Sequence, residues 1–401
     1  LRYLSSMKIN NSDINILGAG AFGLSISIEA VKRGYSVCVL DKDIPGKEAS
    51  IWALGRIDPL LRSSYAPKLN DSKKNNSIGY GKKVISNNTS LDQDVLTKKS
   101  YNSLLKFIPE LQDITKVDLE YDDRPTLQFL NSSEELNIAK KNSKIWLKQG
   151  FKNEIVFKDS NQINSSRYNI GPYGAMLLEG PFFIDSYNYQ RSLYLYAKKI
   201  GVNFVQGNII KSVPKSNSVI TYTDSGEFSS ENLIISLGPW TGEYCNKMGY
   251  KVPIIPQKGE ILRTTLPISG PFSEHLISNC SLIQKKDGDV WIAATTENCG
   301  FDRNPTNKAK NSLLNEAKNM MPDMNTVEIK KQTVCFRPVT FDDMPIVDTL
   351  DFEKKIFIAG GGGGSGIMRS KIISEIMLNI LDGDNKSMLR GISLNRFKNN
   401  K

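Results

Sequence analysis

The stretch Ile14-Asn15-Ile16-Leu17-Gly18-Ala19-Gly20-Ala21-Phe22-Gly23-Leu24 decides the fold of this chain. It joins a short apolar strand to a glycine-rich turn with the spacing G-x-G-x-x-G, and a helical pattern continues from the turn to about Gly34. A second apolar strand over residues 35–40 then ends at Asp41. Because strand, turn, helix and strand follow in the order that the glycine pattern requires, the sequence predicts a dinucleotide-binding βαβ unit.

Each glycine of this turn has a physical role. Gly18 permits the tight turn, Gly20 lets the backbone approach a pyrophosphate, and Gly23 lets the helix pack closely on the strand. The helix N-terminus adds N–H donors and the positive end of its dipole. Asp41 is placed to bond a ribose hydroxyl. The unit alone does not separate FAD from NAD, so an NAD-dependent dehydrogenase stays open at this point.

The bulk composition narrows the class of protein. The chain has 401 residues, 39% of them hydrophobic, which is enough for a sizeable core and two domains. Its formal net charge of +10 comes mostly from scattered lysines without a basic and aromatic cluster, so we expect no nucleic-acid partner. A basic surface does suit anionic substrates or peripheral contact with a membrane.

Five widely spaced cysteines and one histidine do not form a zinc-binding pattern or a disulfide framework, so we predict no metal site. The chain contains no apolar run of the ~18 residues that a membrane-spanning helix needs. We therefore expect a cytoplasmic protein.

A second glycine-rich segment lies near the other end of the chain. An apolar strand over residues 356–359 runs into Gly-Gly-Gly-Gly-Gly-Ser-Gly at 360–366, and a helical pattern follows. Such a bare backbone can approach a flat ring, and the helix N-terminus can stabilise negative charge on it. Upstream, Arg337 in the segment Cys-Phe-Arg-Pro carries a planar guanidinium suited to a carboxylate. An ion pair of Arg337 with nearby Asp342 or Asp343 is the alternative.

These segments and those between them resemble the D-amino-acid oxidase (DAO) family of flavoenzymes, which includes glycine oxidases and sarcosine oxidases. The matching stretches are Gly46-Lys47-Glu48-Ala49-Ser50 with Gly55-Arg56-Ile57, residues 232–240, 255–262 and 290–297, and the segment 333–347. They occur in the family's order over nearly the whole chain, and the stretch from Gly46 to Ile57 looks particularly like that of glycine oxidases. An NAD-dependent dehydrogenase would leave the C-terminal segments unused.

The resemblance implies an α/β (α+β) fold, with a Rossmann-like FAD-binding domain built from discontinuous segments and an antiparallel-sheet substrate domain. We expect the FAD-binding domain to comprise residues 11–90, 166–244 and 331–385, the substrate-binding domain residues 91–165 and 245–330, and a C-terminal tail residues 386–401. The polar residues 63–90 are predicted to form a loop.

The resemblance also implies the cofactor, FAD, and the residues that contact it. These are Gly18, Ala19, Gly20, Phe22, Gly23, Asp41, Lys42, Ala49, Ser50, Gly55, Arg56, Ile57, Ile210 (through the backbone of its strand), Gly238, Trp240, Arg337, Gly362, Gly363, Gly364, Ser365, Gly366 and Ile367. In the family the arginine of this motif binds the substrate carboxylate, a role that falls here to Arg337. The implied reaction passes a hydride from the substrate to flavin N5, oxidising the C–N bond of glycine, sarcosine or a D-amino acid to an imine that hydrolyses to a 2-oxo acid.

The chain departs from the family at three positions. Cys335 stands where a glycine is usual, and in monomeric sarcosine oxidases a cysteine there binds the flavin covalently. A thioether at Cys335 and a buried free thiol are therefore both open. Trp291 and Met368 replace the lysines that sarcosine oxidases use for oxygen and for the carboxylate, which points to a glycine-oxidase-like or dehydrogenase-like member.

Several alternatives remain at this stage. Either oxygen or a quinone accepts the electrons, and the second case describes a D-amino-acid dehydrogenase. A tRNA-modifying flavoenzyme of the same fold and a flavin-bearing subunit of a larger complex are further readings, and the sequence leaves the oligomeric state open.

Overall fold

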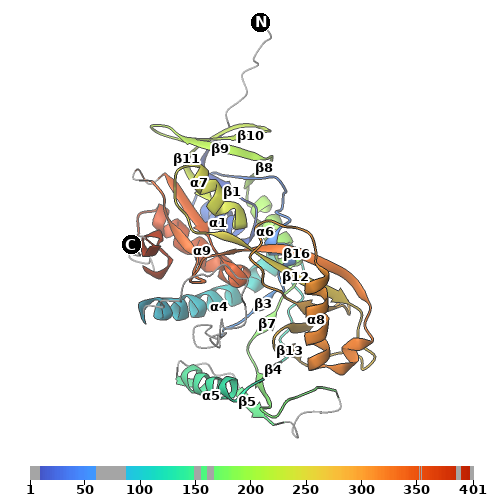
Figure 1. Ribbon diagram of the computed structural model, residues 1–401. Coiled ribbons are helices and arrows are strands. Elements are labelled where there is room, and N and C mark those ends of the chain that lie inside the picture. The colour runs from blue at the N-terminus through green and yellow to red at the C-terminus, as the bar shows by residue number, and fades with distance from the viewer. Residues whose placement is uncertain are drawn as a thin grey trace.

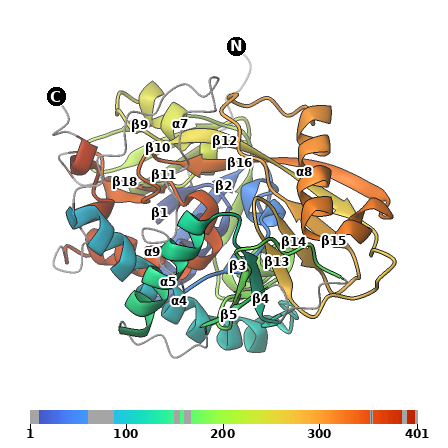
Figure 2. The ribbon, with the colours of Figure 1, turned by 60° about the horizontal axis from the view of Figure 1, so that its bottom comes forward.

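The computed structural model describes residues 10–59, 87–148, 155–159, 167–351, 353, 355–384 and 390–397. In these residues the chain forms two eight-stranded sheets and a two-stranded one (Figures 1 and 2). The loop predicted over 63–90 lies outside the described residues as far as 86, and residues 87–90 begin helix α4.

The first sheet has a parallel centre, in the order β17-β18-β11-β1-β2-β8, in which only β17 runs antiparallel to its neighbour. Its strands are β1 (Asn10–Leu17), β2 (Val37–Asp41), β8 (Asn203–Gln206), β9 (Ile209–Pro214), β10 (Val219–Thr223), β11 (Gly226–Ile235), β17 (Ile346–Thr349) and β18 (Ile356–Gly360). Strands β9 and β10 extend it as an antiparallel meander from β11. The predicted βαβ unit is thus the middle of this sheet.

Helices cover the first sheet because its central strands are apolar on both faces. The helices on one face are α1 (Ala21–Lys32), α4 (Asn87–Thr115), α6 (Ser186–Lys199) and α9 (Gly366–Leu381). Ile14 and Ile16 of β1 point into that layer and are fully buried. Leu17 points to the other face, where it packs in a cluster with residues of β10 and of α7 (Thr241–Lys247).

The second sheet has the order β16-β12-β15-β14-β13-β4-β6-β5 and is antiparallel except for the β13–β4 pair. Its strands are β4 (Thr126–Phe129), β5 (Ile155–Lys158), β6 (Ala175–Leu178), β12 (Ile255–Thr264), β13 (His275–Ile277), β14 (Ser281–Gln284), β15 (Val290–Ala293) and β16 (Ile329–Val339). Helix α8 (Asn307–Met320), at the right of both ribbon views, packs on one face, where Leu313 joins Leu262 and Ile292 in an apolar core.

Short elements complete the chain. They are α2 (Ala49–Trp52), β3 (Arg56–Ile57) paired with β7 (Phe182–Phe183), α5 (Ser133–Lys148), and the 3-10 helices η2 (Gly238–Trp240), η3 (Pro322–Asn325), η4 (Gly363–Ser365), η6 (Arg390–Ile392) and η7 (Leu394–Phe397).

The structure confirms the predicted fold class but shifts three domain boundaries. Helix α4, expected in the substrate domain, packs with the first sheet's helices, because Leu104 and Leu111 bury their side chains in that core. Strands β6 and β16, expected in the FAD-binding segments, belong to the second sheet. In the predicted C-terminal tail, Ile392 is fully buried in the first core. An apolar helix face shows that it needs a partner but does not show which one.

Candidate active site

A large cavity of about 680 Å³ lies between the two sheets and is lined by residues of both. Most of the predicted cofactor residues line it. They are Gly18, Gly20, Phe22, Asp41, Lys42, Ala49, Ser50, Gly55, Arg56, Gly238, Trp240, Arg337, Gly362, Gly363, Gly364, Ser365, Gly366 and Ile367, together with Cys335. The structure thus brings the two glycine-rich segments, more than 300 residues apart, to one space.

The turn after β1 requires glycine for two different reasons. Gly18 has φ of +110°, and a Cβ on it would lie 2.2 Å from the carbonyl oxygen of Ser236. A Cβ on Gly23 would lie 1.9 Å from the carbonyl oxygen of Gly18. Gly23 itself does not line the cavity, so it serves the close packing of helix on strand, as the sequence predicted.

Side chains from distant segments hold the N-terminus of α1 in place. Its N-cap residue, Gly20, has no side chain to offer, and instead Ser50 Oγ accepts a hydrogen bond from the amide of Ala21 at 3.0 Å. Asp41 Oδ2 accepts one from the amide of Ala19 at 2.6 Å. Burial raises the pKa of the Asp41 carboxyl, and the amide donors oppose this rise. Ala19 therefore braces the turn through its backbone and does not line the cavity.

The C-terminal glycine run gives the cavity a bare backbone wall. Strand β18 leads through η4 into α9, whose N-terminus, like that of α1, faces the cavity. A Cβ on Gly363 or Gly366 would meet nothing within 4 Å, whereas one on Gly362 would lie 3.0 Å from the ring of Phe22. Two open helix N-termini and an unobstructed glycine surface suit the phosphates and the flat ring of a flavin dinucleotide.

Besides Ala19 and Gly23, two more predicted cofactor residues lie off the cavity. Ile57 is fully buried in β3 and aligns with Phe182 of β7. Ile210 of β9 points to solvent with 62% of its surface exposed, while Asn208 and Ile209 line the cavity instead. Neighbouring residues of a strand point to opposite faces, and a short apolar pair in the sequence does not reveal which one turns inward. The predicted contact at Ile210 runs through the backbone of the strand, which the direction of its side chain does not test, so it stays a prediction.

Arg337 occupies the second sheet's side of the cavity. It lies on β16 opposite Gln257 of β12, and its guanidinium folds over Gly259, where a Cβ would come within 2.8 Å of Nη2. Nη1 donates a hydrogen bond to the carbonyl oxygen of Thr295 at 3.1 Å. Asp342, one of the two carboxylates considered as its partner, is bound instead by Arg396 at 2.7 Å. Glycine at 259 thus makes room for a guanidinium inside the cavity.

Cys335 also lines the cavity, on β16 opposite Gly259. Burial raises the pKa of its thiol, an effect that the nearby Arg337 opposes. The thiolate is the nucleophilic form, so this environment does not favour a spontaneous thioether. All five cysteines of the chain are free.

A segment of which the sequence analysis singled out only the first residues, within 290–297, lies at the cavity. We call residues 294–306, between β15 and α8, the strap. Ala294 and Thr296 line the cavity. Further along, the ring of Phe301 stacks on Trp240 at 5.1 Å between centroids, and Arg303 lies 2.8 Å from a carboxylate oxygen of Glu48. The strap therefore ties the second sheet's layer to the predicted cofactor residues.

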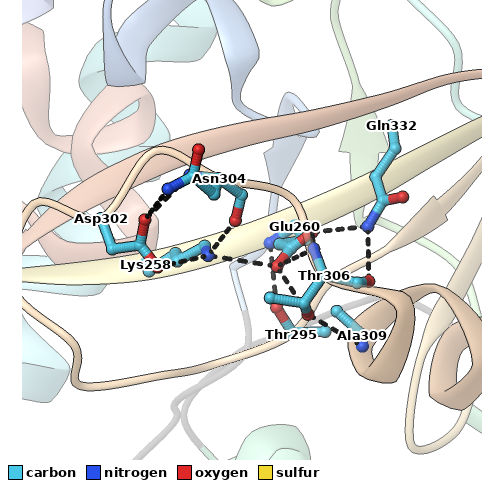
Figure 3. A network of polar contacts seen from close by, with 8 residues as sticks. All are labelled: Lys258, Glu260, Thr295, Asp302, Asn304, Thr306, Ala309 and Gln332. Atoms are coloured by element: carbon cyan, nitrogen blue, oxygen red, sulfur yellow. Dashed lines mark hydrogen bonds and ion pairs between the residues drawn. The ribbon is translucent and has the colours of Figure 1, made fainter.

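A buried ion pair anchors the end of the strap (Figure 3). Lys258 Nζ lies 3.3 Å from a Glu260 carboxylate oxygen and donates to the carbonyl oxygen of Asn304 at 2.6 Å. Glu260 accepts hydrogen bonds from the amide and hydroxyl of Thr306, the N-cap of α8, and from Gln332. Every charge in this network has partners, which is the condition for a buried ion pair to hold a structure together.

Another part of the cavity wall is mostly apolar. It comprises Trp52, Ala53, Leu54, Ile261, Ser281, Ala293 and Met368. Ile261 and Ala293 belong to stretches that match the family, and Met368 stands where a lysine was considered. The sequence analysis missed the others, Trp52, Ala53, Leu54 and Ser281, because they meet only when the two sheets are folded together. In the described part of the chain no group of three or more metal-binding side chains is gathered, and none of the helices there is long and apolar enough to cross a bilayer.

The arrangement defines a class of protein in which a long dinucleotide lies along a parallel sheet and presents its reactive end to a small-molecule pocket beneath an antiparallel sheet. The family follows from the comparison with known proteins. A family model described as FAD dependent oxidoreductase (DAO) matches residues 13–379. The chain belongs to this family, and it is an FAD-dependent oxidoreductase of the amino acid oxidase and dehydrogenase type. The predicted family, cofactor and enzyme class are confirmed.

The individual relatives are distant. The D-amino acid dehydrogenase of Vibrio atlanticus (strain LGP32) is 24% identical over 406 residues, which cover 92% of this chain and 96% of the relative. The crystal structure of glycine oxidase from Geobacillus kaustophilus has a TM-score of 0.82 at 20% identity and covers 96% of this chain and 99% of its own. Iminodiacetate oxidase from Chelativorans sp. BNC1 has a TM-score of 0.78 at 18% identity, with 95% and 98% covered.

Proposed function

We propose that this enzyme oxidises the C–N bond of a small amino or imino acid whose carboxylate is bound by Arg337. The observation that carries the proposal is the guanidinium of Arg337 inside the cavity, on the wall that faces the two glycine-rich turns. A planar guanidinium can hold a carboxylate by two parallel hydrogen bonds and so fix the orientation of the carbon next to it. The names of the relatives, which include glycine oxidase and D-amino acid dehydrogenase, support an amino acid substrate.

The chain's own residues would share the work. FAD, when bound, supplies the two-electron oxidation. The N-terminus of α1, with Gly20 and Ser50, and the carboxylate of Asp41 would hold its pyrophosphate and ribose, and the Gly362–Gly366 turn would lie against its ring. Trp52, Leu54 and Ile261 exclude water around the substrate, so the charge of Arg337 acts in a medium of low polarity. The imine product would then hydrolyse to a 2-oxo acid.

The test is the visible spectrum of the purified holoenzyme under anaerobic conditions during addition of glycine, sarcosine, L-proline and D-alanine in turn. We expect at least one of them to bleach the oxidised-flavin band. Arg337→Met should raise the half-saturating substrate concentration by about 10-fold to 150-fold, the range for a lost hydrogen bond to a charged group. Arg191→Met, an exposed arginine of α6, is the matched control and should change nothing. If no amino acid bleaches the band, the proposal fails.

Two additions to this experiment settle the acceptor and the linkage. Air admitted after bleaching restores the band rapidly in an oxidase, whereas a dehydrogenase needs a quinone. Acid precipitation of the holoenzyme should release the flavin into the supernatant, because the raised pKa of the Cys335 thiol keeps it protonated. A yellow precipitate would instead establish the thioether.

A further inference from the structure

The cavity-facing side of the second sheet carries a group of positive charges that the proposed reaction does not use. Arg263 of β12 lies 5.1 Å from the ring centre of Trp52 and 4.2 Å from that of Trp291. Lys285, which follows β14, lies 4.7 Å from the ring centre of Trp291, and Lys331 of β16 lies 5.2 Å from that of Trp52. We call Arg263, Lys285 and Lys331 the cationic cluster.

None of the three cations has an ion-pair partner at close range in the described chain. Among the residues that the structure describes, no carboxylate oxygen lies within 4 Å of any of the three cations. Lys285 is only 9% exposed, and its ammonium donates a single hydrogen bond, to the carbonyl oxygen of Leu54 at 3.2 Å. Arg263 is half-buried, and its Nε has no hydrogen-bond partner in the described chain. Burial lowers the pKa of both Lys285 and Arg263, and carboxylates beyond ion-pair distance, Asp185 and Asp287 among them, oppose this fall.

Buried cations without a close counter-charge destabilise the fold. Transfer of a charge out of water is unfavourable unless another charge or a set of hydrogen bonds replaces the water. Aromatic faces replace only part of the lost hydration. Proteins tolerate such conflicts mainly at sites where a ligand resolves them. The cluster is therefore better explained by a bound anion than by the packing of the sheet.

The cluster does not line the cavity itself but lies next to Trp52 and Leu54, which do, and it is separated from Arg337 along β12. Gly259, Ile261 and Arg263 alternate along β12 and so face the same side of the sheet. The guanidinium of Arg337 lies over Gly259, and Ile261 lines the cavity. Arg263 is four residues beyond Gly259, a distance of about 13 Å along an antiparallel strand.

The wall between Arg337 and the cluster belongs to both sites. Trp52 and Leu54 line the cavity, and the same two residues contact Arg263, Lys331 and Lys285. A group that extends from Arg337 past Ile261 would therefore meet the cluster. Two charge-assisted contacts, each about 2.8 Å from nitrogen to oxygen, fit within that span and leave room for a short chain between two carboxylates.

We propose that the cationic cluster binds a second anionic group of the substrate, so that the enzyme acts on amino or imino dicarboxylates. This inference rests on the proposed function, because it takes the first carboxylate to be bound by Arg337. A dicarboxylate gains contacts with Arg263 and Lys285 that are strong in a site shielded from water. A neutral amino acid leaves both cations without a partner and binds more weakly.

The experiment measures binding without turnover. Non-reacting carboxylates are titrated into the holoenzyme, and the dissociation constant is read from the shift of the oxidised-flavin spectrum. We expect succinate and glutarate to bind at least about 10-fold more tightly than propionate and butyrate, as a lost contact to a charged group predicts. Lys285→Met and Arg263→Met should abolish this preference while leaving the constant for propionate unchanged. Lys286→Met, an exposed neighbour paired with Asp118, is the matched control.

A second series uses substrates and separates the two proposals. The anaerobic bleaching is repeated with D-aspartate, D-glutamate and iminodiacetate beside D-alanine, glycine and sarcosine, and we expect the dicarboxylates to be the better substrates. If neutral amino acids bleach the flavin equally well or better, the dicarboxylate proposal is overturned and the proposed function stands. If neither these six compounds nor L-proline bleaches it, both are overturned. The wild-type comparison needs no variant, so a substitution that impairs folding does not remove the test.

Discussion

Two lysines are buried in the same antiparallel sheet, on opposite faces and in opposite circumstances. Lys258 lies on the α8 face, is 1% exposed, and has Glu260 at 3.3 Å. Lys285 lies on the cavity face, is 9% exposed, and contacts a carbonyl oxygen but no carboxylate of the described chain. A buried charge that the protein itself neutralises is part of its architecture. One that it leaves unneutralised beside a cavity is part of its binding chemistry.

The network around Lys258 helps to position the strap, which lies at the cavity. Glu260, held by Lys258, bonds the N-cap residue Thr306 and so fixes both the start of α8 and the end of the strap (Figure 3). The strap in turn reaches Trp240 through Phe301. The network therefore helps to hold the strap against Trp240 on the cofactor side of the cavity, although neither Lys258 nor Glu260 lines the cavity.

The largest expected effect is on stability. Glu260→Gln removes the buried partner of Lys258 and leaves an ammonium without a full counter-charge, which should lower the free energy of unfolding by about 3–5 kcal/mol. Urea denaturation followed by tryptophan fluorescence measures the change. The double variant Lys258→Met/Glu260→Gln should lose less than the sum of the two single variants, because no lone charge is left inside.

An exposed ion pair supplies the control for this prediction. Lys116 and Asp113 on and next to α4 lie 2.8 Å apart with both side chains about four-fifths exposed, so Asp113→Ala should leave the denaturation midpoint unchanged. A Glu260→Gln variant as stable as the wild type would show that the ion pair contributes nothing to the stability of the fold. Lys258 would then not be a structural residue, and its contrast with Lys285 would fail.

Lys285→Met should act in the opposite direction. Removal of an uncompensated buried charge is expected to raise the free energy of unfolding by about 1 kcal/mol or more at neutral pH, while binding of dicarboxylates is lost. The measurement is again urea denaturation, without added ligand. A clear loss of stability would mean that Lys285 is a structural residue like Lys258.

The pH dependence of that stability difference follows from the lowered pKa of Lys285. Because the unfolded chain keeps the ordinary lysine pKa, it binds more protons than the folded protein between the lowered value and the ordinary one. In that interval the stability of the wild type rises with pH relative to Lys285→Met. The advantage of the variant should therefore shrink as the pH is raised towards the ordinary pKa of lysine, and a constant difference would contradict the assignment.

The sequence predicts the glycine-rich turns and the motif arginine better than it predicts the charged groups beside the cavity. The turn at Gly18, Gly20 and Gly23 and the glycine run at 360–366 could be recognised because a tight turn, a helix start and a ligand's close approach each demand residues at fixed spacing. Arg337 could be recognised by its motif. All of these except Gly23, which serves the packing of α1 on β1, line the cavity.

The cationic cluster could not be predicted in this way. Trp52, Arg263, Lys285 and Lys331 come from four separate segments, and each looks alone like an ordinary surface charge or core aromatic. Only the register of β12 with β15 and β16 puts Arg263 opposite both Trp291 and Lys331. The burial of Lys258 could not be predicted either, because it results from the packing of α8 on the sheet.

A smaller effect is expected at the strap. Arg303→Gln removes the contact with Glu48 at 2.8 Å, a half-exposed ion pair worth about 1 kcal/mol or less. Its loss should raise the dissociation constant for FAD by up to about 5-fold, since the strap contacts residues that line the cofactor side of the cavity. Titration of the apoprotein with FAD, followed by flavin fluorescence, measures it. Lys308→Gln, exposed in the first turn of α8, is the control.

The smallest effect is expected at Lys331, the exposed member of the cationic cluster. Because water and salt screen an exposed ammonium, Lys331→Met should weaken glutarate binding only about 2-fold, and the difference should vanish at high ionic strength. The contribution of Lys285, which is buried, should persist under the same conditions. Measuring the glutarate constant of both variants from low to high salt therefore ranks the cations by burial. Equal salt sensitivity for the two would place Lys285 in contact with solvent and remove the distinction between it and an ordinary surface charge.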